Sequence, residues 1–308
     1  MVQPATRQTS LDDIATPEGT FAVVAMDQRN TLKRMYAAVG IDDPGHDELV
    51  GIKADVVSAL GGVASAFLLD PTYGMPALGR ADRSSGASYG VLVAAESQVR
   101  DTYEGEPRAS YDPQQNAQWV VDQGGHAVKF LIQVRADRAV AVGALDLTAE
   151  AIGVIRTVVD DCRACGVPSV IENLIYPIRG AADLSPGQRA DAIIGAARVL
   201  DELEPDLLKL EYPGSPEACR RLAKEIRSPW AVLSAGVAFD EFTRVLAVSC
   251  DEGGASGFIA GRAVWRDAVG MAPDARRAYL ADEGVRRLEG CVEAISGRAR
   301  PWTEVRAA

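Results

Sequence analysis

The feature that most constrains the fold of this chain is the regular alternation of short apolar runs with longer amphipathic stretches. Eight runs rich in Val, Ile, Leu, Ala and Phe occur along the 308 residues, at Phe21–Asp27, Ser65–Asp70, Tyr89–Glu96, Ala127–Val134, Ser169–Tyr176, Leu207–Tyr212, Trp230–Gly236 and Gly257–Arg262. Helical patterns lie between most of them, near Asp47–Leu60, Pro113–Gln123, Thr148–Cys165, Ser185–Leu203, Pro216–Ile226 and Asp240–Glu252. Alternating strand and helix signals indicate parallel strands in one sheet, and eight is the strand count of a (β/α)8 barrel. The sequence therefore predicts an α/β protein with the TIM-barrel fold.

An open, doubly wound sheet would produce a similar alternation of strands and helices. That alternative is disfavoured because no G-x-G-x-x-G follows the first apolar run and the chain contains no P-loop. No internal repeat or interdomain linker interrupts the pattern. We expect a single domain over residues 1–308, with an N-terminal extension at 1–19 and a C-terminal helical tail at 273–308.

Composition excludes several classes of function. A net charge of −11 argues against nucleic acid or an anionic membrane as the main partner, because both require a basic footprint. No apolar run approaches the roughly 18 residues of a membrane span, and Met1–Thr9 lacks the apolar core of a signal peptide, so a cytoplasmic location is predicted. Only two histidines occur, His46 and His126, and the C-x-x-C pair of Cys162 and Cys165 has no second pair to complete a zinc site. We expect neither a metal nor another cofactor.

Lys209 lies inside one of the apolar runs. Alternation along a strand places Leu207, Lys209 and Glu211 on one face of the sheet. A buried ammonium loses hydration, which favours the neutral amine, and a neutral amine can attack a carbonyl to form a Schiff base. The alternative is a structural lysine that pairs with Glu211 or extends its ammonium from the strand end into water.

The fourth apolar run has one wholly apolar face and one mixed face. The apolar face, suited to packing under the outer helices, consists of Val128, Phe130, Ile132 and Val134. The opposite face consists of Lys129, Leu131, Gln133 and Arg135, which we expect to point into the barrel. A barrel whose interior carries a lysine and an arginine at this strand has a polar, chemically active mouth.

Active sites of such barrels lie at the carboxyl ends of the strands, so the polar residue that closes each run is a candidate. These residues are Asp27, Asp70, Glu96, Lys129, Glu172, Lys209, Ser234 with Gly236, and Gly261 with Arg262. Small residues and an arginine after the last two strands favour a phosphate site, because glycine lets backbone N–H groups approach an anion and arginine offers a fork of donors. The alternative is two glycine turns and a surface arginine.

Six segments together resemble the family of class I tagatose-bisphosphate aldolases and sulfofructosephosphate aldolases. They are Asp27-Gln28-Arg29, Leu69-Asp70-Pro71-Thr72-Tyr73-Gly74, Gly125-His126-Ala127-Val128-Lys129-Phe130-Leu131, Leu207-Leu208-Lys209-Leu210-Glu211, Leu233-Ser234-Ala235-Gly236-Val237 and Gly261-Arg262-Ala263-Val264-Trp265. The likeness spans roughly residues 12–270. It implies that Lys209 forms the Schiff base, and that Asp27, Lys129 and Glu172 match the family's catalytic carboxylates and second lysine.

The resemblance implies cleavage of a phosphorylated ketose to dihydroxyacetone phosphate and a three-carbon aldehyde. Glu172 would take the C4 hydroxyl proton and Asp27 would hold substrate hydroxyls, although these two roles can be exchanged. Lys129 would keep Lys209 neutral through like-charge repulsion. The expected substrate-binding residues are Gln28, Arg29, Asp70, Arg135, Glu211, Ser234, Gly236, Gly261 and Arg262.

The short connection between Tyr212 and Trp230 resembles the sulfofructosephosphate branch, so the sequence predicts 6-deoxy-6-sulfofructose 1-phosphate as substrate and sulfolactaldehyde as product. The alternative is a tagatose or fructose 1,6-bisphosphate aldolase that yields glyceraldehyde 3-phosphate. A transaldolase and a non-catalytic sugar-phosphate sensor remain further alternatives. The partner is a small phosphorylated sugar rather than nucleic acid or membrane, and the family resemblance implies a homo-oligomer.

Overall fold

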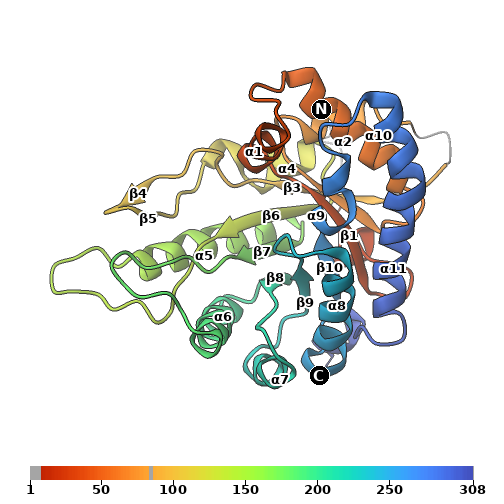
Figure 1. Ribbon diagram of the computed structural model, residues 1–308. Coiled ribbons are helices and arrows are strands. Elements are labelled where there is room, and N and C mark those ends of the chain that lie inside the picture. Colours follow the sequence, from red (N-terminus) through yellow and green to blue (C-terminus); the bar gives the residue numbers. More distant parts are fainter. Residues whose placement is uncertain (1–7, 83–85, 308) are drawn as a thin grey trace, which may run out of the picture.

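The computed structural model of the protein describes residues 8–82 and 86–307. Eight parallel strands form a closed barrel in the order β1-β10-β9-β8-β7-β6-β3-β2 (Figure 1). They are β1 (Phe21–Met26), β2 (Ala66–Leu69), β3 (Gly90–Ala94), β6 (Ala127–Ile132), β7 (Ser169–Asn173), β8 (Leu207–Glu211), β9 (Trp230–Leu233) and β10 (Gly257–Ala260). The predicted TIM barrel and all eight of its strands are confirmed.

Helices surround the barrel and connect its strands. They are α1 (Asn30–Ala38), α2 (His46–Leu60), α3 (Gly74–Leu78), α4 (Ala117–Asp122), α5 (Leu147–Cys165), α6 (Pro186–Asp201), α7 (Pro216–Glu225), α8 (Phe239–Gly253), α9 (Arg262–Trp265), α10 (Pro273–Tyr279), α11 (Val285–Ile295) and α12 (Trp302–Arg306). Side-chain caps fix where several of them begin: Asp146 accepts a hydrogen bond from Ala149 N at the start of α5, and Ser185 with Gln188 forms a capping box at α6. None of the helices in the described part of the chain is long and apolar enough to cross a bilayer.

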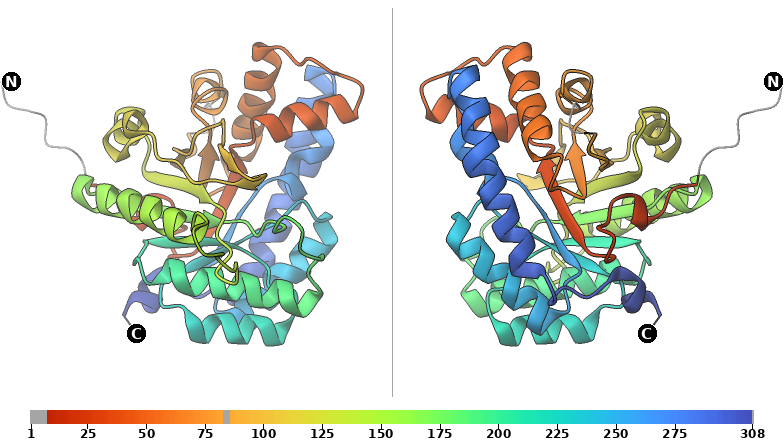
Figure 2. Two further views of the ribbon diagram at one scale, coloured as in Figure 1. Left: turned by 90° about the vertical axis from the view of Figure 1, so that its left-hand side faces the viewer. Right: turned by 90° about the vertical axis from the view of Figure 1, so that its right-hand side faces the viewer.

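The end of the chain packs against the barrel's outer layer. A π turn at Leu280–Gly284 joins α10 to α11, and α11 runs along the outside of the molecule beside α8 and α2 (Figure 2). A short antiparallel hairpin, β4 (Thr102–Tyr103) with β5 (Glu106–Pro107), projects beside the barrel between β3 and β6. Glu106 anchors this hairpin, since its Oε2 accepts hydrogen bonds from Arg138 Nε at 2.8 Å and Tyr176 O–H at 3.1 Å.

Alternation along each strand produces two separate apolar layers. The inward side chains form a compact core inside the barrel that contains Phe21, Val23, Ala25, Ala66, Leu68, Leu92, Ala94, Ala127, Val170, Leu207, Ala231 and Ile259. Leu11 and Ile14, from the segment before β1, join this inner core. The outward residues, such as Val128 and Phe130, pack under the helices as the sequence predicted. The interior of the barrel is therefore a filled core, and chemistry is possible only at its rim.

Candidate active site

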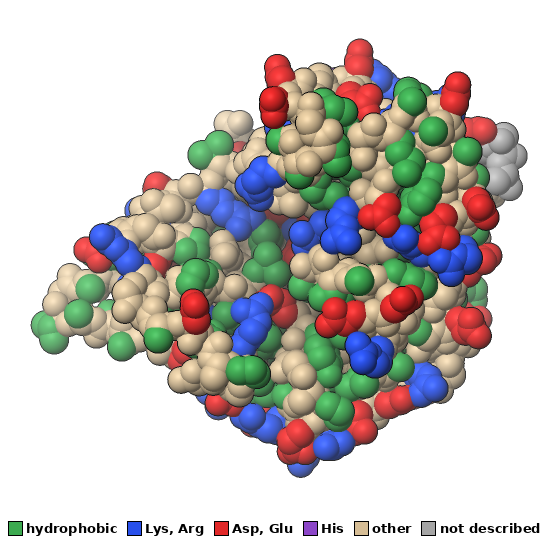
Figure 3. Space-filling model, viewed as in Figure 1, with side chains coloured by type: hydrophobic (Ala, Val, Ile, Leu, Met, Phe, Trp, Pro, Cys, Tyr) green, Lys and Arg blue, Asp and Glu red, His purple; other side chains and the backbone are tan. Residues whose placement is uncertain are grey.

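A polar layer lies directly above the inner core at the carboxyl ends of the strands. Each of its members stands two residues beyond an inner apolar side chain and therefore points the same way. The layer consists of Asp27 after Ala25, Glu96 after Ala94, Lys129 after Ala127, Glu172 after Val170, and Lys209 after Leu207. The molecular surface in Figure 3 is hollowed near its centre, with lysine and arginine side chains around the hollow. Such a rim attracts an anionic substrate despite the negative net charge of the chain.

Lys129 is the centre of the polar layer. Its side chain is fully buried, and its Nζ lies 2.8 Å from Asp27 Oδ2, 2.8 Å from Glu96 Oε1 and 2.8 Å from Glu172 Oε2. Burial alone would lower the pKa of Lys129, but the three carboxylates raise it well above its ordinary value. An ammonium has three N–H donors, and here each faces one carboxylate. Lys129 is therefore a fixed positive charge.

Lys209 and Glu172 are neighbours on adjacent strands. They face each other in the register between β7 and β8, and Lys209 Nζ lies 3.0 Å from Glu172 Oε2. Burial would raise the pKa of Glu172, but Lys129 and Lys209 lower it below its ordinary value. The same two lysines overcome the effect of burial on Asp27, whose pKa is also lowered. One carboxylate oxygen of Glu172 thus contacts both lysines and can relay a proton from Lys209.

Lys129 has a structural role in addition to the one expected of it. It forms ion pairs with Asp27, Glu96 and Glu172 and thereby holds these carboxylates in place. Like-charge repulsion of Lys209 by Lys129 stays a prediction. Glu96 was a candidate from its place at the end of an apolar run, without an assigned role, and its spacing from Ala94 gives the same inward alternation as the others.

Gln28 and Arg29 extend the polar layer beyond β1. Gln28 Nε2 donates to Asp27 Oδ1 at 3.2 Å, while Gln28 Oε1 is buried and has no hydrogen-bond partner among the described residues. Arg29 donates from Nη2 to Glu96 O at 3.1 Å, and the same nitrogen lies 3.9 Å from Glu96 Oε1. An unpaired buried acceptor is costly, so Gln28 Oε1 is suited to a donor from a sugar hydroxyl.

The turn after β9 has the geometry of an anion site. Ala235 and Gly236 both have positive φ, 48° and 87°, and Val237 N closes the turn on Ser234 O at 3.0 Å. A turn of this type can direct successive backbone N–H groups toward an anion. The Arg262 guanidinium packs so closely on Gly236 that a Cβ there would lie 3.2 Å from Nη1. Among the described residues, no acceptor forms a hydrogen bond or ion pair with this guanidinium, and burial lowers the pKa of Arg262.

Gly261 has a packing role at the end of β10. A Cβ at this position would lie 1.9 Å from Ala25 O and 2.5 Å from Trp265 Nε1, so only glycine fits. Trp265 Nε1 also donates to Ala25 O at 3.1 Å. Gly261 therefore fixes the approach of β10 to β1 and the direction in which Arg262 leaves the strand.

Two predicted substrate-binding residues have other roles in the structure. Asp70 is fully buried and accepts hydrogen bonds from the backbone N–H groups of Thr72, Tyr73 and Gly74 in addition to its ion pair with Lys53. Arg135 donates from Nε and Nη2 to the Asp137 carboxylate at 2.8 Å, and from Nη1 to Tyr176 O at 2.6 Å. Asp70 follows the end of β2 as Asp27 follows that of β1, and Arg135 lies three residues beyond β6, so partners within the protein and not the distance from the strand distinguish these two residues. The bonds that the structure gives to both side chains are made within the protein.

Glu211 keeps the predicted inward position but is also bonded within the protein. Its Oε2 accepts from Ile175 N at 2.8 Å, and its Oε1 pairs with Arg189 at the start of α6. Burial raises the pKa of Glu211, although these two partners oppose that shift. With both oxygens occupied, Glu211 positions the loop between β7 and α6 at the edge of the mouth.

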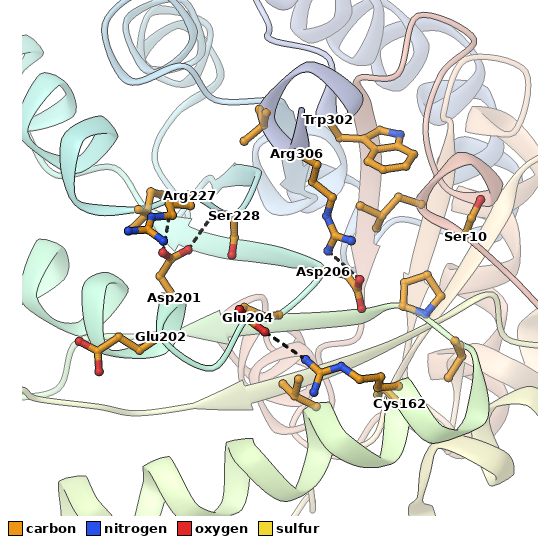
Figure 4. A pocket seen from close by; sticks show the side chains of 18 of the residues that line it. Ser10, Cys162, Asp201, Glu202, Glu204, Asp206, Arg227, Ser228, Trp302 and Arg306 are labelled. Atoms are coloured by element: carbon orange, nitrogen blue, oxygen red, sulfur yellow. Dashed lines mark hydrogen bonds and ion pairs between the residues drawn. The ribbon is translucent and has the colours of Figure 1, made fainter. Parts of the chain in front are cut away.

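A second cleft lies at the opposite end of the barrel. It has a volume of about 1170 Å³ and is lined by residues that precede β7 and β8, together with Ser10, Trp302 and Arg306 (Figure 4). Ion pairs cross it, with Arg306 2.7 Å from Asp206 and Arg163 3.7 Å from Glu204. The cleft lies at the amino ends of the strands, the end of a barrel that does not carry the active site, and none of the described residues that line it is a lysine.

The sequence matches the model of one protein family. That model is described as "DeoC/LacD family aldolase" and matches residues 21–267, which include all eight barrel strands. Among curated proteins, tagatose 1,6-diphosphate aldolase 2 of Streptococcus pyogenes serotype M3 is 28% identical, with 93% of this chain and 94% of that protein covered. Tagatose 1,6-diphosphate aldolase of Lactococcus lactis subsp. lactis is 26% identical, with 99% of both chains covered.

Solved structures share the fold. An archaeal fructose 1,6-bisphosphate aldolase superposes with a TM-score of 0.60 at 17% identity and covers 92% of this chain and 96% of its own. The likeness extends over nearly the whole barrel.

Proposed function

The chain belongs to the DeoC/LacD family of aldolases, which are lyases, and on that premise we propose that it is a Schiff-base aldolase for a ketose 1,6-bisphosphate. The products would be dihydroxyacetone phosphate and glyceraldehyde 3-phosphate. The observation that carries this proposal is the inward Lys209, whose Nζ lies 3.0 Å from a carboxylate that Lys129 also holds. A buried amine beside a fixed base is the arrangement that imine chemistry requires.

The proposed cycle begins when Lys209 Nζ attacks the C2 carbonyl of the open-chain ketose. The carbinolamine loses water to give an iminium, and Glu172, next to Lys209, relays the protons of this step. A carboxylate then takes the C4 hydroxyl proton, the C3–C4 bond breaks, and its electron pair moves into the iminium to give an enamine. The aldehyde leaves, the enamine is protonated at C3, and water hydrolyses the resulting iminium to free dihydroxyacetone phosphate and Lys209.

The charges at the mouth support a sugar that carries two anionic groups. Arg262 and the turn at Ala235 and Gly236 suit one phosphate, because the guanidinium has donors to spare and the turn has positive φ angles. Arg29 is the candidate for the group at C6. The relatives described above are named for tagatose 1,6-diphosphate, and none of them is named for a sulfonated sugar. A ketose 1,6-bisphosphate is therefore the proposed substrate, in place of the 6-deoxy-6-sulfofructose 1-phosphate that the sequence predicts. Assembly into a homo-oligomer and a cytoplasmic location remain predictions.

A substrate comparison tests this proposal directly. We expect tagatose or fructose 1,6-bisphosphate to be cleaved with kcat/KM at least about tenfold above that for 6-deoxy-6-sulfofructose 1-phosphate, because a phosphate dianion gains more from a guanidinium than a sulfonate monoanion does. Coupled assays for dihydroxyacetone phosphate and for each aldehyde measure this. Faster cleavage of the sulfonated sugar would restore the sulfofructosephosphate prediction, and absence of cleavage of all three would reject the aldolase proposal.

Arg262→Ala is expected to raise KM more than it lowers kcat. A charge-assisted hydrogen bond to a phosphate contributes about 1.5–3 kcal/mol, which corresponds to a loss of roughly 10- to 100-fold in kcat/KM. Arg262→Lys should recover part of this loss, because lysine keeps the positive charge but lacks the paired N–H donors of the guanidinium. The matched control is Arg286→Ala, an arginine of α11 that pairs on the surface with Glu283. Equal effects of the two alanine substitutions would contradict a phosphate role for Arg262.

A further inference from the structure

Lys53 is a fully buried lysine that the proposed chemistry does not use. It lies in the middle of α2, outside the barrel, and its Nζ reaches the upper end of β1. There it donates to Met26 O at 2.5 Å and Gln28 O at 3.0 Å, and it forms an ion pair with Asp70. Three acceptors match the three N–H donors of an ammonium. Lys53 is thus fully satisfied within the protein.

The two carbonyls that Lys53 holds belong to Met26 and Gln28, the residues on either side of Asp27. Strand β1 ends at Met26, so its ladder does not hold the chain beyond that residue. The ammonium of Lys53 replaces the ladder at this point, because it fixes the peptide group that precedes Asp27 and the one that follows Gln28. The backbone between these two fixed points sets the direction of the Asp27 side chain, whose Oδ2 lies 2.8 Å from Lys129 Nζ.

Asp70 keeps Lys53 itself in one position. The Asp70 carboxylate accepts from Thr72 N at 3.0 Å, Tyr73 N at 2.9 Å and Gly74 N at 3.1 Å, at the start of α3. A Cβ at Gly74 would lie 2.8 Å from Leu69 Cβ, so this segment packs tightly against β2. The anchor of Lys53 is therefore joined to the end of β2 and the start of α3.

A buried ion pair such as this one adds little net stability. Desolvation of both charges offsets their attraction, and apolar residues of similar size are often as good or better. The ion pair instead fixes the relative positions of three elements, because it joins α2, the end of β1 and the end of β2 at the edge of the polar layer. The aldolase chemistry proposed above depends on the placement of the carboxylates in that layer.

We propose that Lys53 is a positioning residue, which with Asp70 holds the carbonyls of Met26 and Gln28 and thereby aligns Asp27 with Lys129 and the sugar. The proposal rests on the proposed aldolase function for its kinetic consequences, but not for its structural one. Lys53 contacts neither the substrate nor the reacting atoms. Its influence passes through Asp27.

A double-mutant cycle tests the kinetic consequence. The paired variant Lys53→Met with Asp70→Asn removes the charges together, and we expect kcat to fall by about 100-fold, the cost of a misplacement near 1 Å. KM should change less than about threefold. In an Asp27→Asn background the same paired substitution should lower kcat less than about threefold, because effects that act through one residue are not additive. A full 100-fold loss in that background, or an unchanged kcat in the folded paired variant, overturns the proposal.

A matched control separates positioning from general loss of stability. Arg276→Met with Asp55→Asn removes another buried ion pair of α2, formed with α10 at 2.7 Å and remote from β1. This control should lower the urea midpoint while kcat stays unchanged. Should the Lys53 and Asp70 variant fail to fold, Asp70→Asn alone serves, with a smaller loss of kcat and the same non-additivity with Asp27→Asn.

A crystal structure of the folded variant gives a readout that does not depend on activity. We expect the contact between Asp27 Oδ2 and Lys129 Nζ, 2.8 Å in the intact protein, to lengthen by about 1 Å or to be lost. An unchanged contact overturns the positioning proposal whatever the substrate is. Failure of the wild-type protein to cleave any ketose phosphate would instead count against the proposed function alone.

Discussion

Lys209→Met is expected to abolish sugar cleavage, with a loss of kcat on the order of 10⁵- to 10⁶-fold, similar to loss of the nucleophile in other covalent enzymes. Methionine has nearly the same length, so the inward position above Leu207 stays filled while the amine is removed. Without an imine, electrons from the broken C3–C4 bond have no acceptor. Single-turnover assays at high enzyme concentration measure the residual rate. The matched control is Lys224→Met, an exposed lysine of α7, which should retain full activity.

Borohydride reduction provides a direct chemical test of the same residue. Treatment of the wild-type protein with dihydroxyacetone phosphate and borohydride should attach the reduced triose phosphate to the peptide that contains Lys209, as found by mass mapping. The Lys209→Met protein should carry no such adduct. An adduct on Lys129 in the wild-type protein, or substantial activity of Lys209→Met, would contradict the assignment.

The polar layer was predictable because it follows from backbone alternation. Asp27 directly follows β1, while Lys129, Glu172 and Lys209 lie within β6, β7 and β8, and the closed barrel brings these inward positions together whatever the loops do. Strand starts were predicted to within one residue, whereas the predicted runs extended up to three residues beyond the observed strand ends, as at Trp230–Gly236 against Trp230–Leu233. The predicted runs are longer than the strands because the chain continues in the same direction for one to three residues after the hydrogen bonds between strands end.

Partners from other parts of the fold decide the placement of the residues that alternation alone does not explain. Asp70 pairs with Lys53 of α2, and Arg135 donates to Tyr176 O. Lys53 stands in a helix pattern that predicts an apolar face, and nothing local indicates that its ammonium reaches β1. Helices α1 and α3 were not predicted, since both are short and lie within connections between strands. Contacts between segments far apart in the sequence decide the placement of these side chains and short helices.

Lys129→Met is the second substitution with a large expected effect, this time on stability as well as on activity. It leaves Asp27, Glu96 and Glu172 close together without their shared cation. Breaking a buried ion pair by removing one partner costs about 3–5 kcal/mol in the free energy of unfolding. We expect a loss of this size at pH 7 in urea unfolding, and kcat reduced by at least about 100-fold because Glu172 and Asp27 lose their placement.

The pH dependence of this loss has a definite sign. In the wild-type protein the pKa values of Asp27 and Glu172 lie below their ordinary values of 3.8 and 4.5, so their stabilisation is present above about pH 4.5 and is lost as the pH falls through the lowered values. The pKa of Lys129 is raised from 10.5, so its contribution is complete below that pH and is lost only as the pH rises through the raised value. These three groups therefore contribute no slope to the stability of the wild-type protein between about pH 5 and pH 10.

Without Lys129 the carboxyl groups should contribute a slope in the acid range. Burial and the repulsion between Asp27 and Glu172 then raise the pKa of these carboxyl groups, so that the folded protein binds protons more readily than the unfolded chain between about pH 7 and pH 4.5. The free energy of unfolding of Lys129→Met should increase more steeply as the pH is lowered from 7 to 5 than that of the wild-type protein or of Lys224→Met. Urea unfolding at pH 5, 6 and 7 measures the slope. A variant that loses the same free energy at every pH would show that the three carboxylates do not depend on Lys129 for their ionised state.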